Sequence, residues 1–286
     1  MILFEDRAAT LLYKVLTHLP NRKFLLPLNV CPIVPDTFLR AKVNFEFIDI
    51  NLDTLCIDEE LALSKMQSDA TIDGILFVKT FGIEFDIQPF YKKIKALNKD
   101  IFIIDDMCPC IQEFHYDIEN SYADMALFSS GYSKYIDIGC GGYAFLKDSF
   151  TYPHFDNQSI QSEFSTYKHK ILSLIPVMKE HKEQLNAIYR DNLPVNIHLG
   201  EKFNTWRFSI LVDNKEKILE EICKVEGLFA SSHFPQIDYN YTKNPMQNSN
   251  AKKIHNRIIN LFNDFRFNKE KAYQVVDIIN HNLNKD

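Results

Sequence analysis

The chain has 286 residues, 46% of them hydrophobic, and its 38 acidic and 32 basic side chains give a net charge of −6. This composition is typical of a globular protein long enough for one large domain and a smaller one. Binding to nucleic acid or to an anionic membrane surface is not expected, because both need a basic patch and no lysine or arginine cluster stands out in the sequence.

The sequence gives no sign of a targeting or membrane segment. The first residues, MILFEDRAAT, include two acids where a signal peptide has a basic flank and a long apolar core. No apolar run approaches the roughly 20 residues that a membrane helix needs. The one close cysteine pair, Cys108 and Cys110, lacks the second pair or nearby histidine of a zinc site. We therefore expect a cytoplasmic protein with free thiols and no bound metal.

Strands and helices alternate through the first half of the chain. Apolar residues at helical spacing predict a first helix over residues 6–16. The alternation that follows predicts an α/β fold, with a mostly parallel central sheet and helices on both faces. The expected strands are 24–28, 44–50, 74–80, 101–106 and 125–128, and the expected helices between the first four are 33–41, 59–66 and 87–97.

The second half of the chain differs in character. Residues 150–165 are polar and predict an irregular crossover, and residues 167–189 predict a long helix. We therefore divide the chain into a large domain at 1–150 and a linker helix with a small α+β C-terminal domain at 151–286. The small domain is predicted from a strand at 207–212, a helix at 215–225, a short strand at 228–231, the segment 251–262 and a closing helix at 269–283.

One lysine, Lys134, lies between a buried strand and a glycine-rich turn in the stretch DMALFSSGYSKYIDIGCGG. A lysine amine is a poor nucleophile while protonated, but desolvation lowers its pKa and lets it form a Schiff base with a carbonyl group. An ordinary surface lysine in a loop between two strands is the alternative interpretation.

Two carboxylates, Asp105 and Asp106, end the strand IFIIDD upstream of this lysine. Ligands of open α/β sheets bind outside the carboxyl ends of the strands, so an acid at this position is a candidate for function. An acid, a hydroxyl and an amine in this order suit the ring nitrogen, phosphate and aldehyde of pyridoxal phosphate. Alternatively, the acids simply end a strand and cap the next segment.

The ordered set of motifs resembles the DegT/DnrJ/StrS-type sugar aminotransferases, which are fold type I enzymes that depend on pyridoxal phosphate. The similarity covers most of the chain, although the region after residue 165 is much longer in that family. The similar stretches are residues 23–58, GILFVKTFGIEFD at 74–86, the acid pair, Lys134 with its glycine turn, and WRFSILV at 206–212.

This resemblance implies a role for each matching residue. Lys134 would form the Schiff base, Asp106 would hold the protonated pyridine nitrogen, and Ser129 would bind the phosphate. The amides of Ala8 and Ala9, at the start of the first helix, would also bind the phosphate. Ala8 stands where the family has a hydroxyl side chain, for which Thr10 is a candidate replacement, and Ser133 is a second candidate for the phosphate-binding role of Ser129.

Three further positions lie around the expected cofactor. Cys31 stands where family members often stack an aromatic ring on the pyridine. Arg207 would hold a substrate carboxylate through its planar fork, and His233 would touch substrate. For Arg207 the alternative is a basic residue beside a tryptophan at the domain boundary.

The resemblance implies an aminotransferase that moves an amino group, by family habit from glutamate, to a keto sugar attached to a nucleotide, within a homodimer. A dehydratase of the family would replace Lys134 with histidine. Two other hypotheses stay open. A pyridoxal-phosphate enzyme could act on an amino acid, and a degenerate homologue without turnover could serve as a binding or regulatory protein. The second is favoured by the departures at Ala8, Cys31, Pro109 and Cys140 and by the lack of the family's cross-dimer Asn-Tyr-Arg-like motif.

Overall fold

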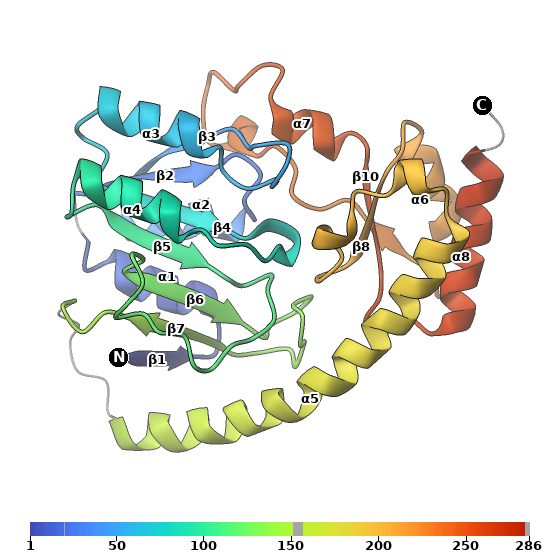
Figure 1. The fold of residues 1–286 in the computed structure, drawn as a ribbon, viewed down its shortest axis with the longest axis horizontal. Coiled ribbons are helices and arrows are strands. Elements are labelled where there is room, and N and C mark those ends of the chain that lie inside the picture. Colours follow the sequence, from blue (N-terminus) through green and yellow to red (C-terminus); the bar gives the residue numbers. More distant parts are fainter. Residues whose placement is uncertain (20, 151–156, 284–286) are drawn as a thin grey trace.

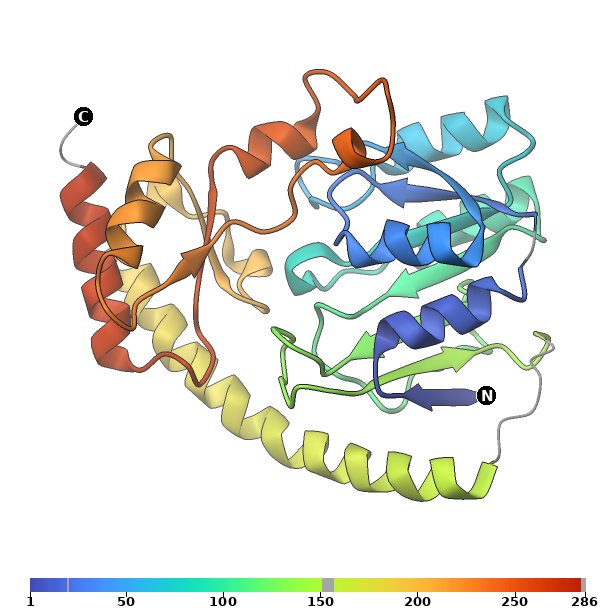
Figure 2. The same cartoon turned by 180° about the vertical axis from the view of Figure 1, so that it is seen from behind.

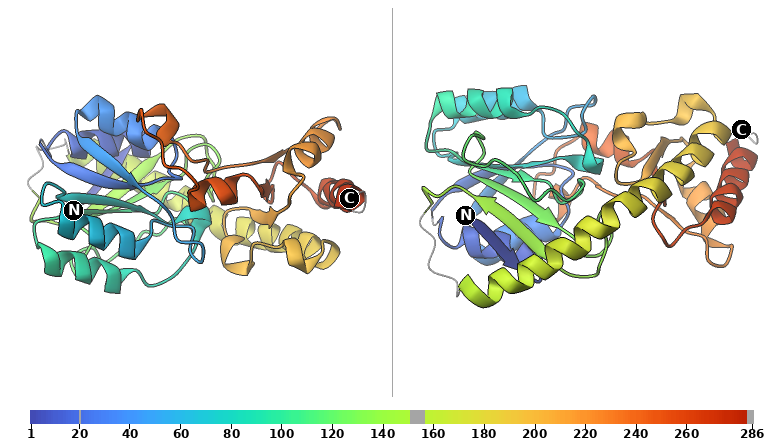
Figure 3. Two further views of the ribbon diagram at one scale, coloured as in Figure 1. Left: turned by 90° about the horizontal axis from the view of Figure 1, so that it is seen from above. Right: turned by 60° about the horizontal axis from the view of Figure 1, so that its bottom comes forward.

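The computed structural model describes residues 1–19, 21–150 and 157–283 of the chain. Figure 1 shows a large part built on a broad sheet and a smaller part that contains the C-terminal helix. The long helix α5 (Asn157–Asn192) runs from one part to the other, as the right view of Figure 3 also shows. None of the described helices is both long and apolar enough to cross a lipid bilayer.

A seven-stranded sheet forms the centre of the large part, in the order β1-β7-β6-β5-β4-β2-β3. Neighbouring strands from β3 to β6 pair in parallel, whereas β7 runs antiparallel to both β6 and β1. The predicted mostly parallel sheet is therefore confirmed. The strands are β1 (Ile2–Glu5), β2 (Lys23–Pro27), β3 (Asn44–Ile48), β4 (Gly74–Val78), β5 (Phe102–Asp106), β6 (Met125–Ser129) and β7 (Gly142–Leu146).

Helices cover both faces of this sheet, as Figures 1 and 2 show from opposite sides. Helices α1 and α2 share an apolar core with Phe102 and Ile104 of β5, whereas α3 and α4 share another with Ile103. Successive residues of a strand point to opposite faces, so Asp106 faces α1 and α2 while Asp105 faces α3 and α4. The helices are α1 (Ala8–Leu16), α2 (Ile33–Ala41), α3 (Glu59–Ser68) and α4 (Gln88–Leu97).

The small part has its own apolar core, which joins the end of α5 to an antiparallel sheet of order β8-β10-β9. Part of the chain then folds back on the large part, where the amide of Asn250 donates to Asp49 Oδ2 (2.7 Å). The remaining elements are β8 (Phe208–Leu211), α6 (Lys215–Cys223), β9 (Ala230–Ser231), α7 (Asn250–His255), β10 (Ile258–Leu261) and α8 (Lys269–Leu283), with short 3-10 helices at Thr80–Gly82, Val195–Ile197, Glu201–Phe203 and Asp238–Asn240.

The structure differs from the sequence-based expectation in three places. Strands β1 and β7 were not predicted, and they pair with each other although they lie at opposite ends of the large part's sequence. Residues 157–165, expected to be irregular, form the first turns of α5, while 151–156 of that crossover lie outside the described residues. The segment 251–262, for which no element type was predicted, contains all of β10 and all of α7 but its first residue. The domain limits at 1–150 and 151–286 stay a prediction.

The first turn of α1 packs directly against the start of β7. A Cβ atom added at Gly142 would lie 2.2 Å from the backbone nitrogen of Ala8 and 2.5 Å from its Cα atom. The Gly141 amide next to it donates to the carbonyl of Asp6 (2.6 Å). Because no side chain fits in this space, Gly142 allows the start of α1 to reach the edge of the sheet.

We expect the substitution Gly142→Ala to destabilise the protein by about 1–3 kcal/mol or more, because the added methyl group must push the backbone of α1 away. Urea unfolding followed by circular dichroism would measure the loss. Gly131→Ala is the matched control, since its Cβ atom would meet only Ser129 Oγ at 3.5 Å, an ordinary contact distance. Equal stability of the two variants would contradict the close packing at Gly142.

Candidate functional site

A cavity of about 280 Å³ opens at the carboxyl ends of β5 and β6, and we call it the first cavity. Its walls come from the starts of α1 and α2, the two strand ends and the turn after β6. The structure thus brings together most of the residues that the sequence singled out. Those that line the first cavity are Ala8, Ala9, Cys31, Asp106, Ser129 and Lys134.

Only one of the two paired acids faces this cavity. Asp106 is 5% exposed, lines the cavity, and accepts a hydrogen bond from the Cys108 amide through Oδ1 (2.9 Å). Asp105 lies on the opposite face of the sheet, where its Oδ2 accepts a hydrogen bond from the Tyr116 hydroxyl (3.2 Å). Burial raises the pKa of Asp105 to about 6, while the positive charge of Lys79 opposes this shift. A ligand in the first cavity can therefore meet the carboxylate of Asp106 but not that of Asp105.

Other groups that line the first cavity suit an anion. Ala8 and Ala9 begin α1, and the first amides of a helix have no intrahelical acceptor and carry partial positive charge. The guanidinium-bearing residue Arg7 also lines the cavity and makes no side-chain cap hydrogen bond to the helix. Ser129, at the end of β6, is 6% exposed, and its hydroxyl accepts a hydrogen bond from the Gly131 amide (3.2 Å). Amides, a hydroxyl and a cation are the groups that bind phosphate.

Lys134 stands between the first cavity and a second one of about 330 Å³, because it lines both. The lysine is half-buried, and its amide donates to the carbonyl of Gly131 (3.3 Å). Cys31 and Tyr132 also border both cavities. The amine of Lys134 is therefore placed where groups held in the two cavities can meet.

The second cavity lies between the large and small parts and has mainly apolar walls. Trp206 and Phe234 of the small part face Pro32 and Pro109 of the large part across it. His233 also lines it, and its Nδ1 is buried without a hydrogen-bond partner among the described residues. Burial, followed by the nearby cations, lowers the pKa of His233 to about 4. At neutral pH the imidazole is therefore uncharged.

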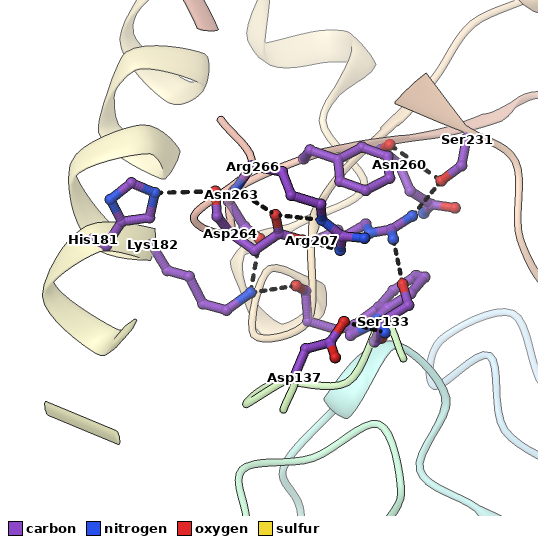
Figure 4. A network of polar contacts seen from close by, with 12 residues as sticks. Ser133, Asp137, His181, Lys182, Arg207, Ser231, Asn260, Asn263, Asp264 and Arg266 are labelled. Atoms are coloured by element: carbon purple, nitrogen blue, oxygen red, sulfur yellow. Dashed lines mark hydrogen bonds and ion pairs between the residues drawn. The ribbon is translucent and has the colours of Figure 1, made fainter. Parts of the chain in front are cut away.

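Arg207 lines neither cavity. Its side chain is 2% exposed and donates to the hydroxyls of Ser133 and Ser231, as Figure 4 shows. The predicted contact with a substrate carboxylate stays a prediction, and the described partners of this guanidinium are protein hydroxyls. The alternative phosphate ligand Thr10 does not line the first cavity, and Ser133 faces the second one.

Arg7 and Tyr132 are among the lining residues that sequence reasoning missed. Arg7 lies within the helix predicted at residues 6–16, but the structure starts α1 at Ala8, which places Arg7 just before the helix, where it lines the cavity. Tyr132 is 74% exposed and lies two residues before Lys134, but nothing in its type or spacing distinguishes it from a surface tyrosine. No group of three or more histidine, cysteine or acidic side chains among the described residues is placed to share a metal ion.

The donor set of the first cavity fits pyridoxal phosphate. Ser129, Arg7 and the α1 amides suit the phosphate, Asp106 suits the ring nitrogen, and Lys134 suits the aldehyde. The close approach at Gly142 supports this fit, because it brings the α1 amides to the same sheet edge as Asp106. Cys31, which matches the family's ring-stacking position, lines this cavity, and so does the aromatic side chain of Tyr132.

Comparison with solved structures identifies the fold. DesI in the presence of its TDP-sugar product superposes with a TM-score of 0.80 at 14% identity, over 99% of this chain and 81% of that one. PseC from Helicobacter pylori, an aminotransferase of pseudoaminic acid biosynthesis, gives 0.77 at 17% identity, over 100% and 87%. The sugar aminotransferase CalS13 from Micromonospora echinospora gives 0.72 at 12% identity, over 98% and 87%. No family model and no curated protein sequence matches the chain. The chain therefore has the fold of these aminotransferases.

The raised pKa of Asp105 predicts a specific pH dependence of stability. Its carboxyl binds a proton more tightly in the folded protein than at its ordinary pKa of 3.8, so wild type loses stability as pH rises from 3.8 to about 6. Asp105→Asn lacks this loss. We therefore expect the variant's free energy of unfolding, relative to wild type, to rise by up to about 3 kcal/mol across this window and then stay constant.

Urea unfolding of both proteins at several pH values would measure this difference. Asp117→Asn is the control, because hydrogen bonds from Asn120 lower the pKa of this exposed carboxylate, so its pH dependence has the opposite sign. A difference for Asp105→Asn that does not change with pH would contradict the effect of burial.

Proposed function

We propose that this chain is a pyridoxal-phosphate-dependent aminotransferase that transfers an amino group, from glutamate as donor, to a keto sugar attached to a nucleotide. The observation that carries the proposal is the meeting of Lys134, Asp106, Ser129 and the start of α1 around one cavity. A protein with the same fold but no cofactor has no need to bring a lysine, an acid and an anion-binding helix start together.

When bound, the cofactor supplies an aldehyde that takes the amino group and a pyridinium ring that draws electrons from the breaking bond. The carboxylate of Asp106 holds the proton on the ring nitrogen, because a negative charge beside that nitrogen favours its protonated form. Lys134, which lines the same cavity, would hold the cofactor through its aldehyde. As a free amine, Lys134 would act as the acid-base group that removes the proton from the donor's alpha carbon.

The second cavity supports a sugar as acceptor. Its aromatic and proline walls, which include Trp206 and Phe234, offer apolar surface to the face of a sugar ring. The uncharged imidazole of His233 can exchange a hydrogen bond with a hydroxyl or carbonyl group. DesI, which has the same fold, was solved with a TDP-sugar product, in agreement with this choice of substrate.

We also propose that two copies of the chain form a dimer. Ile33 and Tyr132 line the first cavity although they are 49% and 74% exposed. Large apolar side chains around a binding site are typical of a surface that another chain covers. Analytical ultracentrifugation should then give twice the chain mass of 33.4 kDa, and a single-chain mass would contradict the dimer.

The visible absorption spectrum of the purified protein with pyridoxal phosphate tests the function. We expect wild type to develop an absorption band that Lys134→Ala lacks, because the band would come from pyridoxal phosphate whose aldehyde is bonded to the Lys134 amine. Glutamate should bleach the band as the amino group leaves the donor. With glutamate and a nucleotide-linked keto sugar, Lys134→Ala should transfer amino groups about 10²–10⁴-fold more slowly, the usual contribution of an acid-base group.

Lys147→Ala is the matched control, since Lys147 follows β7 at the end remote from the cavity. A band that needs Lys134 but ignores glutamate would contradict glutamate as donor. The absence of any band in wild type would refute the enzyme and favour the non-catalytic homologue, which the unusual residues Cys31, Pro109 and Cys140 also suit.

A further inference from the structure

The residue before Lys134 has an unusual backbone conformation. Ser133 has a φ of +63°, in the left-handed region that residues with a side chain rarely occupy. Such a conformation persists only where the surrounding structure holds it in place. Its amide donates to Asp137 Oδ2 (2.7 Å), and its carbonyl accepts from Trp206 Nε1 (2.7 Å). The Ser133 hydroxyl accepts from Arg207, so every polar group of this residue has a partner (Figure 4).

The side chain of Arg207 is itself fixed. Its guanidinium carbon lies 4.3 Å from the centre of the Trp206 ring and 3.6 Å from that of Phe262, between the two rings. One terminal nitrogen donates to the hydroxyl of Ser231 on β9, and the other to that of Ser133. A guanidinium held in a stack and by two hydrogen bonds has little freedom to turn.

Arg207 has no carboxylate partner among the described residues, and the nearby Asp264 pairs with Arg266. Burying a charge without a counter-ion is costly, and an apolar side chain would fill this space more cheaply. The buried side chain of Arg207 lines neither cavity. What the guanidinium adds over an apolar side chain is its pair of directed hydrogen bonds, one of which reaches Ser133.

The neighbouring tryptophan is anchored as firmly. Lys182 of α5 is 4% exposed and donates to the carbonyl of Trp206 (2.6 Å) and to Asn263 Oδ1 (2.8 Å). The amide of Trp206 donates to the carbonyl of Phe81 after β4 (3.3 Å). Trp206 and Arg207 are therefore tied to both parts of the molecule.

We propose that Arg207, supported by Trp206, is a positioning residue for Lys134 and acts through Ser133. The proposal rests on the function proposed above. Fixing the backbone and hydroxyl of Ser133 sets the direction in which the next residue leaves the turn. The Lys134 amine then points at the space shared by the two cavities rather than into solvent. Reactive groups need this degree of alignment, since a misplacement of about 1 Å can cost about 10²-fold in rate.

The step that depends on this alignment is the capture of an aldehyde by Lys134. The neutral amine adds to the aldehyde carbon, a carbon-nitrogen double bond replaces the carbon-oxygen bond, and the oxygen leaves as water with the two amine protons. No oxidant or reductant is needed. The rate of this step therefore measures the position of the amine, while the affinity for a ligand without an aldehyde measures the cavity alone.

The test compares two readouts on the full chain for Arg207→Met, Ser133→Ala and the double variant. The first is the rate constant for capture of pyridoxal phosphate, followed by absorbance and by mass labelling of Lys134 after borohydride reduction. The second is the affinity for 4-deoxypyridoxine 5′-phosphate, which lacks the aldehyde. We expect each single variant to slow capture by about 10- to 100-fold while the analogue's affinity stays at the wild-type value. The double variant should be no slower than Arg207→Met, because both changes remove the same contact.

Ser231→Ala is the matched control, since it removes the other hydroxyl on Arg207 and leaves the contact with Ser133, so its capture rate should stay close to wild type. An unchanged rate in Arg207→Met, or a parallel loss of rate and analogue affinity, would overturn the proposal. If Arg207→Met fails to fold, Ser133→Ala decides alone, because it removes a single hydroxyl.

Failure of wild type to capture pyridoxal phosphate would refute both this proposal and the function on which it rests, whereas normal capture by all variants would refute the positioning role alone.

Discussion

The shared direction of the central strands is the constraint on which the candidate site depends. Because β5 and β6 run in parallel, Asp106 and Ser129 end at the same edge of the sheet and face the same cavity. Strand β7 runs the opposite way, so its first residue, Gly142, lies at that edge too and brings α1 with it. The acid, the hydroxyl and the helix amides thus come from distant points of the chain and meet through sheet topology.

Much of the large part could be predicted from local pattern. The helix expected at 33–41 is found there, and the strand ending in two acids is β5. Strands β1 and β7 could not be predicted in the same way, because their pairing joins residues 2–5 to 142–145, a long-range contact that no local pattern shows. The start of α5 was missed because its residues are polar. It is helical as the continuation of a long helix, with Phe164 packing on Phe4 (5.5 Å between ring centres).

The site was predictable to a different degree for each residue. The local sequence around Lys134 left an ordinary surface lysine open, and the family resemblance supplied the cofactor interpretation. The choice between Asp105 and Asp106 follows from strand alternation once β5 is known. The surroundings of Arg207 could not be read from the sequence, since Ser133, Ser231 and Phe262 come from three separate segments.

Helix α5 supports the turn after β6 at two places, once directly and once through Trp206. Near its start, the Tyr167 hydroxyl hydrogen-bonds Ser130 Oγ (2.8 Å), and further along Lys182 supports Trp206, which bonds Ser133. These two anchors are roughly four helical turns apart. Adding or removing one residue between them would rotate one anchor by about 100° relative to the other. Evolution can therefore change the exposed residues of this stretch freely, but an insertion or deletion within it would detach one of the two anchors from the turn that carries Lys134.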